Sequence, residues 1–460
     1  MMDFPSIIED LYKQIAGLKD RIAYLEQGNK ALKEENVRLR QENDRLKERL
    51  GLNSTNSSLP PSRDLYRAKK ARPRSGRKPG AQPGHKPQGY QLKTPDEIVR
   101  VYPGTCAYGH KIEVGSTYQI HQKMEIPPIK AYVTEYHLYQ GICRSCGDRH
   151  TAELPEGVSP DLLGDHAKAI ISALSGFYHN SKRDVQQILH DIFHLPISLG
   201  LVSTTEKRVS HRLQSSYEEL CKQMEDSPYL HIDETGHKCR GEKGWGWIFT
   251  NRYMSVLKLT SSRGKKVLES ILPEYEGHII SDRYGAYRHF ENEKRQICWS
   301  HLKRDFQRFA HSRNVALVAY GKTLEQIGYE VFVLEKAFKT QAIDYLFFIR
   351  RIRKLKKRMI YALKGILRVP DCPHAHRVAQ NLLNCFEMMW RFVDNREIEP
   401  TNNLAERQIR KYVVYRKKSL FTWSQRGNEF IERIFSLFLT CRLQNQSSFL
   451  RLSHLISAPS

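Results

Sequence analysis

The 460-residue sequence has no apolar run that approaches the ~18 residues of a membrane span. Its first residues, with Asp3, Glu9 and Asp10, lack the basic start and apolar core of a signal peptide. Acids are also scarce, since 50 Asp and Glu face 74 Lys and Arg and leave a net charge of +24. The nine cysteines, an odd number spread through the chain, do not resemble a disulfide framework. We therefore expect a soluble cytoplasmic protein with no membrane partner, whose partner is a polyanion, with nucleic acid as the first candidate.

A heptad repeat runs from residue 8 to residue 50 without a break. One core position holds Ile8, Ile15, Ile22, Asn29, Asn36, Asn43 and Leu50, and the other holds Leu11, Leu18, Leu25, Leu32, Leu39 and Leu46. β-Branched residues at the first position with Leu at the second favour a parallel two-stranded coil, and a buried Asn pairs best with itself in a dimer. A helix packed on its own chain would show a wider apolar stripe. The repeat predicts a coiled coil that joins a homodimer or a higher oligomer.

A basic tract follows the heptads, beyond Gly51 and a Ser-, Asn- and Pro-rich stretch that cannot continue a helix. Nine cations in 24 residues face the single acid Asp64: they are Arg63, Arg67, Lys69, Lys70, Arg72, Arg74, Arg77, Lys78 and Lys86. Interspersed Pro and Gly prevent packing, so we predict a largely disordered arm that contacts DNA phosphates, with Arg72, Arg74, Arg77 and Lys78 as the named contacts. A solvated linker is the alternative.

Two cysteine motifs come next. Cys143 and Cys146 have the C-x2-C spacing of a zinc knuckle, in which two thiolates share one tetrahedral ion. Near Cys106 the second cysteine is missing, because Gly109 stands there and only His110 can supply a fourth ligand. One interpretation is a structural Zn2+ site formed by Cys106, His110, Cys143 and Cys146. The other is a module that has lost its metal.

Residues 160 to 225 show helical apolar spacing, with helices expected at 167–174, at 184–193 and from about Ser203. A short Pro- and Gly-containing turn precedes the third, which carries Lys207, Arg208 and Arg212. A helix-turn-helix is one interpretation and an ordinary helical domain the other.

Short runs rich in β-branched and aromatic residues begin at Tyr229 and predict an antiparallel meander, 229–236, 244–250 and 253–259. Within the first run the strand itself is expected to end at Asp233. A further strand, 277–281, is followed directly by Asp282. Two strands that each end in a carboxylate can hold both at one sheet edge, where a divalent cation neutralises them. Taken singly, each Asp is also a good turn residue. Another strand is expected at 296–300, before a helix from His301.

A third acid follows a long helical region that includes seven cations within residues 350–358, expected either as a DNA-facing surface or as a solvated helix face. Pro400, with Thr401 or Asn402 as cap, predicts a helix start that places Glu406 on one face with Arg410. Glu406 can then point at the same metals as the two aspartates. Glu397 and Glu399 are the rival acids, but both lie in the preceding loop.

These residues together resemble bacterial DDE transposases of the insertion sequence 66 family over nearly the whole chain. Besides the zipper and the zinc knuckle, the matching stretches are Asn56-Ser57-Ser58-Leu59-Pro60-Pro61-Ser62, residues 76–86, His231-Ile232-Asp233-Glu234-Thr235, residues 281–287, residues 298–306 and Asn402-Asn403-Leu404-Ala405-Glu406-Arg407. The resemblance implies an α/β fold with an RNase H-like catalytic core interrupted by a helical insertion. It implies a catalytic triad of Asp233, Asp282 and Glu406, companion proteins of the same mobile element, and a bacterial nucleoid location.

The activity that this resemblance implies is cleavage of transposon ends and joining of the freed 3'-hydroxyl to target DNA. Two Mg2+ or Mn2+ ions, roughly 4 Å apart, would be held by the three carboxylates. The candidates for holding the DNA backbone are Lys303, Arg304, Arg407, Arg410, Arg416, Lys417 and Lys418. Two alternatives remain: an RNase H-like structure-specific nuclease that cuts without joining, and a zipper-type DNA-binding protein without catalysis.

The predicted order of domains follows from these segments. It is a coiled-coil helix at 1–51, the basic arm at 52–95, a zinc-finger-like β module at 96–155, a helical domain at 156–226, the first part of the core at 227–310, the helical insertion at 311–398, and the second part of the core with the tail at 399–460.

Overall fold

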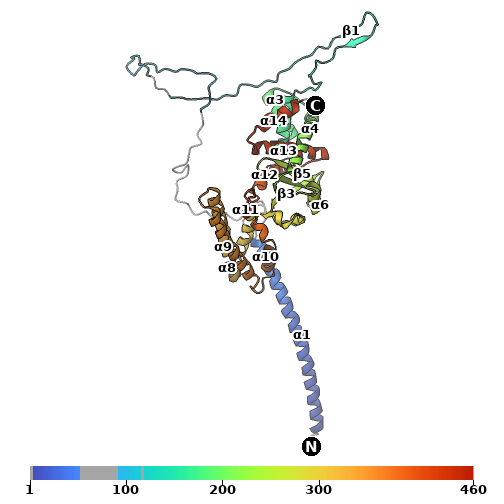
Figure 1. The fold of residues 1–460 in the computed structure, drawn as a ribbon. Coiled ribbons are helices and arrows are strands. Elements are labelled where there is room, and N and C mark those ends of the chain that lie inside the picture. Colours follow the sequence, from blue (N-terminus) through green and yellow to red (C-terminus); the bar gives the residue numbers. More distant parts are fainter. Residues whose placement is uncertain (1–3, 52–91, 116–118, 459–460) are drawn as a thin grey trace. The chain divides into compact units, whose positions relative to one another are not determined.

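The computed structural model describes residues 4–51, 92–115 and 119–458 (Figure 1). The chain forms two compact units. The first comprises Met1–Arg67, Glu225–Asp233 and Arg263–Arg407, and the second comprises Ala68–Met224, Glu234–Ser262 and Gln408–Ser460. The described residues are mostly helical and include a mixed five-stranded sheet, which confirms the α/β class. The predicted DNA contacts Arg72, Arg74, Arg77 and Lys78 lie outside the described residues.

The five strands follow the order β5-β4-β3-β6-β7, and the boundary between the units falls within β3. Their bounds are β3 Tyr229–Cys239, β4 Glu242–Thr250, β5 Ser255–Thr260, β6 His278–Ser281 and β7 Arg295–Ile297. β4 and β5 pair antiparallel, as predicted, whereas β6 pairs parallel with both β3 and β7.

Two details of the predicted strands were wrong. Asp233 does not end its strand, because β3 continues to Cys239; only its pairing with β6 stops at His231. The expected strand at 296–300 ends at Ile297, and Trp299 already begins helix α7, Trp299–Ala310. The fully buried Trp299 indole donates to the Met389 carbonyl, so tertiary packing determines where this strand ends.

The first unit is built on a helical core beside β3, β6 and β7. Before α7 it contains α6 Lys265–Ile271 and the 3-10 helices η3 Gly285–His289 and η4 Asn292–Lys294. After α7 it contains α8 Val315–Lys339, α9 Tyr345–Ile366, α10 Pro373–Asn384, the 3-10 helix η5 Glu387–Met389, α11 Arg391–Asp394 and the start of α12, Asn403–Lys418. α8 and α9 lie side by side (Figure 1). Trp299 and Trp390 meet edge to face with ring centroids 4.8 Å apart, a favourable aromatic geometry.

The second unit holds a helical cluster and the β4–β5 hairpin. Its elements are β1 Gln140–Ile142, β2 Arg149–Thr151, α2 Asp165–Ser172, the π-helix η2 Ala173–Phe177, α3 Lys182–Phe193, α4 Leu199–Arg212, α5 Gln214–Glu225, α13 Gln425–Leu443 and α14 Ser448–Ser457. α3 begins at a capping box in which Ser181 and Asp184 bond to each other's backbone. α4 begins earlier than the expected Ser203, because the Ser198 hydroxyl accepts the Leu201 N–H and caps the helix there.

Helix α13 covers the free edge of the sheet in the second unit. β5 is the last strand in the sheet order, and alternate backbone N–H groups along it, those of Ser255, Leu257 and Leu259, donate to side chains of α13. The acceptors are the hydroxyls of Thr440 and Ser436 and the carboxylate of Glu432, at 3.0, 2.9 and 2.5 Å. Two strand residues rise by about the length of four helical residues, so a polar stripe at four-residue spacing matches the strand. The edge is therefore closed to pairing with another strand.

Glu432 makes the stability of this edge dependent on pH. Burial raises its pKa from the ordinary 4.5 to about 7, so the folded state binds the proton more tightly than the unfolded state does. The stabilisation that comes from protonated Glu432 is complete below pH 4.5 and is lost as the pH rises towards 7. We expect Glu432→Gln, which keeps an acceptor for Leu259, to raise the free energy of unfolding at pH 8 by up to about 3 kcal/mol and to change little at pH 4.5. Denaturant unfolding of the variant at pH 4.5 and pH 8 measures this difference, and Glu429→Gln, which makes the same charge change on α13, is the control. Equal effects of Glu432→Gln at both pH values would contradict the prediction.

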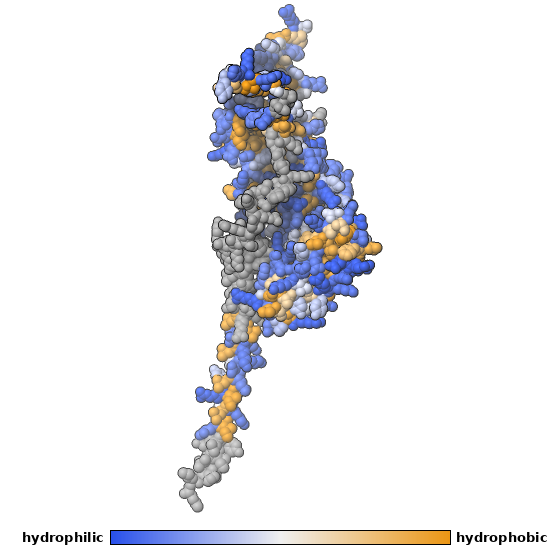
Figure 2. Space-filling model, turned by 90° about the vertical axis from the view of Figure 1, so that its left-hand side faces the viewer, coloured by the Kyte–Doolittle hydropathy of each residue, from blue (hydrophilic) through white to orange (hydrophobic). Residues whose placement is uncertain are grey.

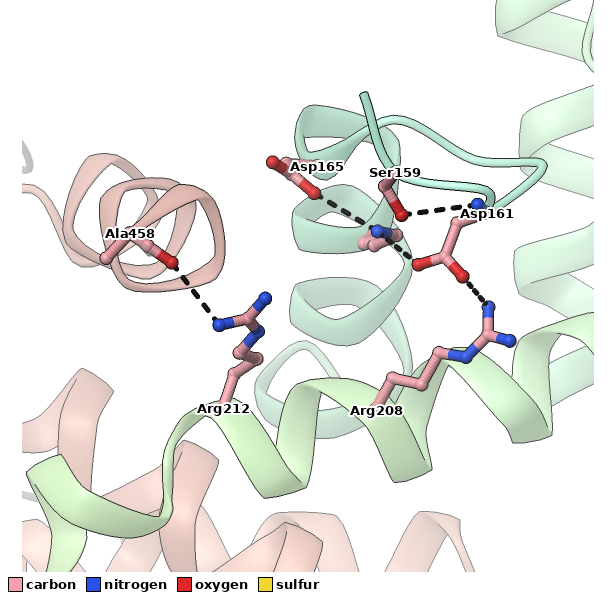
Figure 3. Close-up of polar contacts among 7 residues, drawn as sticks. Ser159, Asp161, Asp165, Arg208, Arg212 and Ala458 are labelled. Atoms are coloured by element: carbon pink, nitrogen blue, oxygen red, sulfur yellow. Dashed lines mark hydrogen bonds and ion pairs between the residues drawn. The ribbon is translucent and has the colours of Figure 1, made fainter. Parts of the chain in front are cut away.

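An ion-pair network joins α2 and α4 in the second unit (Figure 3). The half-buried Asp161 accepts from Lys168 at 2.6 Å and from Arg208 at 2.5 Å, and Lys168 also meets Asp165 at 3.1 Å. Arg212 donates to the Ala458 carbonyl. Arg208 and Arg212, named above for a helix-turn-helix, thus both have partners within the second unit.

Helix α1, Phe4–Gly51, is one continuous helix of 48 residues. Apolar side chains, orange in Figure 2, recur along it among hydrophilic ones. The heptad residues Ile15, Leu18, Ile22, Leu25, Leu32 and Leu39 are 47–63% exposed. This stripe is the surface that the predicted coiled coil would bury. No helix among the described residues is long and apolar enough to cross a membrane.

Candidate metal and nucleic-acid site

The first two acids of the predicted triad follow neighbouring parallel strands. In the β3–β6 pair, Tyr229, Leu230 and His231 stand opposite His278, Ile279 and Ile280. Asp233 comes two residues after the last paired residue of β3, and Asp282 two residues after that of β6. Extending the same register by two residues would set the two aspartates opposite each other, on the same face of the pair.

Four residues form a hydrogen-bonded chain beside these strands. The Cys298 N–H donates to the Ser281 carbonyl at 2.9 Å. The Asn402 N–H donates to Cys298 Sγ at 3.1 Å, and the Asn402 Nδ2 amide donates to the Ile232 carbonyl at 2.7 Å. Cys298 and Asn402 are almost completely buried. The chain links segments that are up to 170 residues apart in sequence.

These bonds fix the backbone next to each acid. Ser281 directly precedes Asp282, and Ile232 directly precedes Asp233. Asn402 immediately precedes α12, and its carbonyl accepts the Glu406 N–H at 3.2 Å. All three acids belong to the first unit and emerge from one hydrogen-bonded framework.

The carboxylates themselves are not all in mutual contact. Among the residues that the structure describes, the only set of three His, Cys, Asp or Glu ligand atoms within 4.8 Å of one another is Cys298, His301 and Glu406. Asp282 Oδ1 accepts the Tyr284 N–H at 2.8 Å, which is the turn interaction that the sequence also allowed. The rival acid Glu397 is exposed and Glu399 precedes α12, outside this set.

His301 lies between acidic and basic neighbours. Burial, together with the charge of Arg304, lowers its pKa, while the charges of Asp282, Glu406 and Asp305 oppose the shift. Its Nδ1 stands 3.8 Å from Glu406 Oε1, and both atoms are buried without a hydrogen-bond partner. Burial also raises the pKa of the Cys298 thiol, against the Asn402 N–H bond. The ligand atoms of Cys298, His301 and Glu406 thus lie within 4.8 Å of one another.

The predicted DNA-backbone cations differ in their surroundings. Arg407, Arg410, Lys417 and Lys418 are exposed on α12, and Arg304 is half-buried on α7. Lys303 Nζ lies 5.2 Å from the centre of the Phe332 ring. Arg416 instead donates to the Gly236 carbonyl, and burial lowers its pKa.

The segment predicted as a zinc-finger-like module contains two cysteine turns. Gly109 and Gly147 have φ values of +80° and +78°, which favour glycine, and they follow Cys106 and Cys146 in tight turns. The second turn joins β1 to β2, and the amides of Cys146 and Ser145 hydrogen-bond to Cys143 and lower its pKa. Within the described part of the chain, Cys106, His110, Cys143 and Cys146 do not supply three ligand atoms within 4.8 Å of one another.

Cys298, His301 and Asn402 were missed as site residues in the sequence. Cys298 and His301 have C-x2-H spacing at the start of a helix, a signal that could have been weighed as a ligand pair. Asn402 was predicted only as a candidate helix cap and as part of a family motif, because the role seen here depends on contacts with residues 104 and 170 positions away.

Comparison with known proteins identifies the class. Residues 181–430 match the model of the transposase IS66 family, and residues 6–91 match a family of unknown function (DUF6444). The first match covers more than half of the chain, so this protein belongs to the IS66 transposase family. Membership implies DNA as a binding partner and the use of a divalent metal.

One curated relative is similar over most of its length. The "Uncharacterized protein y4qI" of Sinorhizobium fredii (strain NBRC 101917 / NGR234) is 21% identical over 377 residues, which cover 74% of this chain and 68% of that protein.

Proposed function

We propose that this chain is a DDE transposase, which cleaves the ends of its insertion sequence and transfers the freed strands to target DNA. The observation that carries the proposal is the hydrogen-bonded chain Ser281–Cys298–Asn402–Ile232, which joins the backbone next to Asp233, Asp282 and Glu406. A regulator that only binds DNA would not need three distant acids on one buried framework. The parallel β3–β6–β7 strands and helix α12 would belong to an RNase H-like core, interrupted by the helices of residues 311–398.

The donor set fits divalent metals. Asp233, Asp282 and Glu406 offer hard carboxylate oxygens, the ligands that Mg2+ prefers, and Glu406 Oε1 is a buried acceptor without a partner. When bound, two Mg2+ or Mn2+ ions would activate the attacking oxygen and stabilise the leaving one. Asp233, Asp282 and Glu406 would be the residues that hold these ions.

The remaining roles belong to basic side chains. Lys303, Arg304, Arg407, Arg410, Lys417 and Lys418 would hold the DNA backbone, which provides affinity rather than sequence choice. Arg416, already bonded to a carbonyl, is the weakest of these candidates. In the first step water attacks a phosphodiester at the transposon end and breaks its P–O3' bond, which leaves a 3'-hydroxyl and a 5'-phosphate. In the second step that 3'-hydroxyl attacks a target phosphodiester. A new 3'-O–P bond forms, the target's P–O3' bond breaks, and the target 3'-hydroxyl leaves.

The other parts of the chain would assemble and guide the complex. The basic arm, 52–95, would meet DNA, and the coiled coil at 1–51 would join a homodimer or higher oligomer. The module at 96–155 would hold Zn2+ if its four ligands close, and companion proteins of the same element would complete the machinery in the bacterial nucleoid.

Joining separates a transposase from a nuclease of the same fold. We expect the purified protein, incubated with DNA carrying the element's terminal repeats and Mg2+, to yield both nicked ends and products joined to a target plasmid. Sequencing across the junctions measures this. Nicked ends without joined products would favour the structure-specific nuclease, and DNA binding without either product would favour the zipper-type DNA-binding protein.

A further inference from the structure

We propose that Cys298, His301 and Glu406 form a second metal site, which takes a transition-metal dication such as Zn2+. The inference concerns binding and stands apart from the proposed reaction. It rests on a ligand set that differs in chemistry from the three carboxylates, although it includes one of them.

The geometry of the three ligand atoms suits a small ion. Their mutual distances are all within 4.8 Å, and His301 Nδ1 lies 3.8 Å from Glu406 Oε1. Two ligands on a tetrahedral ion with bonds of ~2.0–2.1 Å stand roughly 3.4 Å apart. A small side-chain rotation would therefore bring both atoms onto one ion.

Two buried polar atoms without hydrogen-bond partners also support a bound ion. A buried nitrogen and a buried carboxylate oxygen that face each other without hydrogen bonds are costly, and His301 Nδ1 and Glu406 Oε1 are such a pair. A bound dication would satisfy both atoms at once.

The surroundings of Cys298 match those of a metal-bound thiolate. The Asn402 N–H donates to its sulfur, and such a bond stabilises negative charge on a ligand. Cys298 is fully buried, with 0% exposure, whereas the side chains of His301 and Glu406 are 21% and 36% exposed. The cluster therefore joins one buried thiol to two side chains that are partly exposed to solvent.

The chemical types of the three ligands indicate which metal would bind. A thiolate and an imidazole favour Zn2+ or Co2+ over Mg2+, which prefers oxygen. If Glu406 also serves the proposed reaction, Zn2+ bound here would withdraw it from that role; this consequence alone rests on the proposed function.

Cobalt spectroscopy of the full chain tests the site directly. The variant Cys143→Ser/Cys146→Ser serves as background, because it removes the knuckle thiolates as competing ligands. In that background we expect one equivalent of Co2+ to give a thiolate-to-cobalt charge-transfer band and the strong visible bands of four-coordinate Co2+. Adding Cys298→Ser should abolish the charge-transfer band. Adding His301→Gln should weaken Zn2+ binding by roughly tenfold or more, at least the size of effect seen when an outer partner of a metal ligand is removed.

Cys385→Ser is the matched control, since Cys385 is also buried in the first unit but belongs to no such cluster in the described residues. It should keep both the spectrum and the Zn2+ affinity. Circular dichroism reports whether each variant is folded, and His301→Gln tests the site even if Cys298→Ser unfolds. Cobalt binding without a thiolate band in the background protein, or equal losses from Cys385→Ser and Cys298→Ser, would overturn the proposal, whether or not the protein transposes DNA.

Discussion

Asp233→Asn is expected to reduce Mg2+-dependent cleavage of terminal-repeat DNA by roughly a hundredfold to a thousandfold, the range for losing one essential electrostatic group in an active site. The amide keeps the size of the side chain but loses the charge that would hold the metal. DNA binding, which relies on the basic side chains, should persist. Quantified nicking on gels, beside a mobility-shift measurement of binding, checks both parts.

Neighbouring acids supply the controls for this experiment. Glu234 follows Asp233 within β3, and its side chain points to the opposite face of the strand, so Glu234→Gln should retain cleavage. Asp282→Asn and Glu406→Gln should resemble Asp233→Asn. Undiminished cleavage by Asp233→Asn would refute the catalytic assignment, whereas a loss in Glu399→Gln with activity kept in Glu406→Gln would move the third acid into the loop.

Gly321→Ala is expected to lower the free energy of unfolding by at least about 3 kcal/mol, at the upper end for an overpacked core. Gly321 lies on α8 where this helix crosses the end of α7, and an added Cβ would overlap the backbone of Phe309 and Ala310. Backbone atoms cannot rotate away as a side chain can, so the two helices must separate. The melting temperature should fall by roughly 6–12 °C, measured by calorimetry.

Gly328→Ala, seven residues further along α8, is the matched control. Its added Cβ would meet Lys303 Cγ at 3.4 Å, an ordinary contact with a flexible side chain. Since Ala is a better helix former than Gly by about 1 kcal/mol, this change should be neutral or stabilising. Similar destabilisation by both substitutions would show that helix α8 itself, rather than the close approach to α7, responds to the added methyl group.

Local patterns sufficed for several parts of the fold. The heptads predicted a helix through residue 50, and α1 ends at Gly51. Alternating and β-branched runs predicted β4, β5 and β6 to within a few residues. Element ends were less accurate, because a cap such as Ser198 or a buried indole such as Trp299 decides them, and neither is visible in periodicity.

The candidate site was predicted only in outline. Asp233, Asp282 and Glu406 were predicted from their place after strands or on a helix, and the hydrogen-bonded chain that joins their neighbours supports that choice. The cluster of Cys298 and His301 with Glu406 was not foreseen. A C-x2-H pair is too common a pattern to imply a third ligand more than 100 residues away.

The sequence by itself determined the class of chain: its basic charge, its heptads, its mixed α/β pattern and the motifs that place it in the IS66 transposase family. Only the tertiary structure decided which side chains share a space, namely Asn402 with Ile232 and Cys298, and Glu406 with His301. The physical reason is that charge and periodicity are properties of neighbouring residues. Contacts between distant segments arise from the packing of the core, where each buried polar group must find its partner.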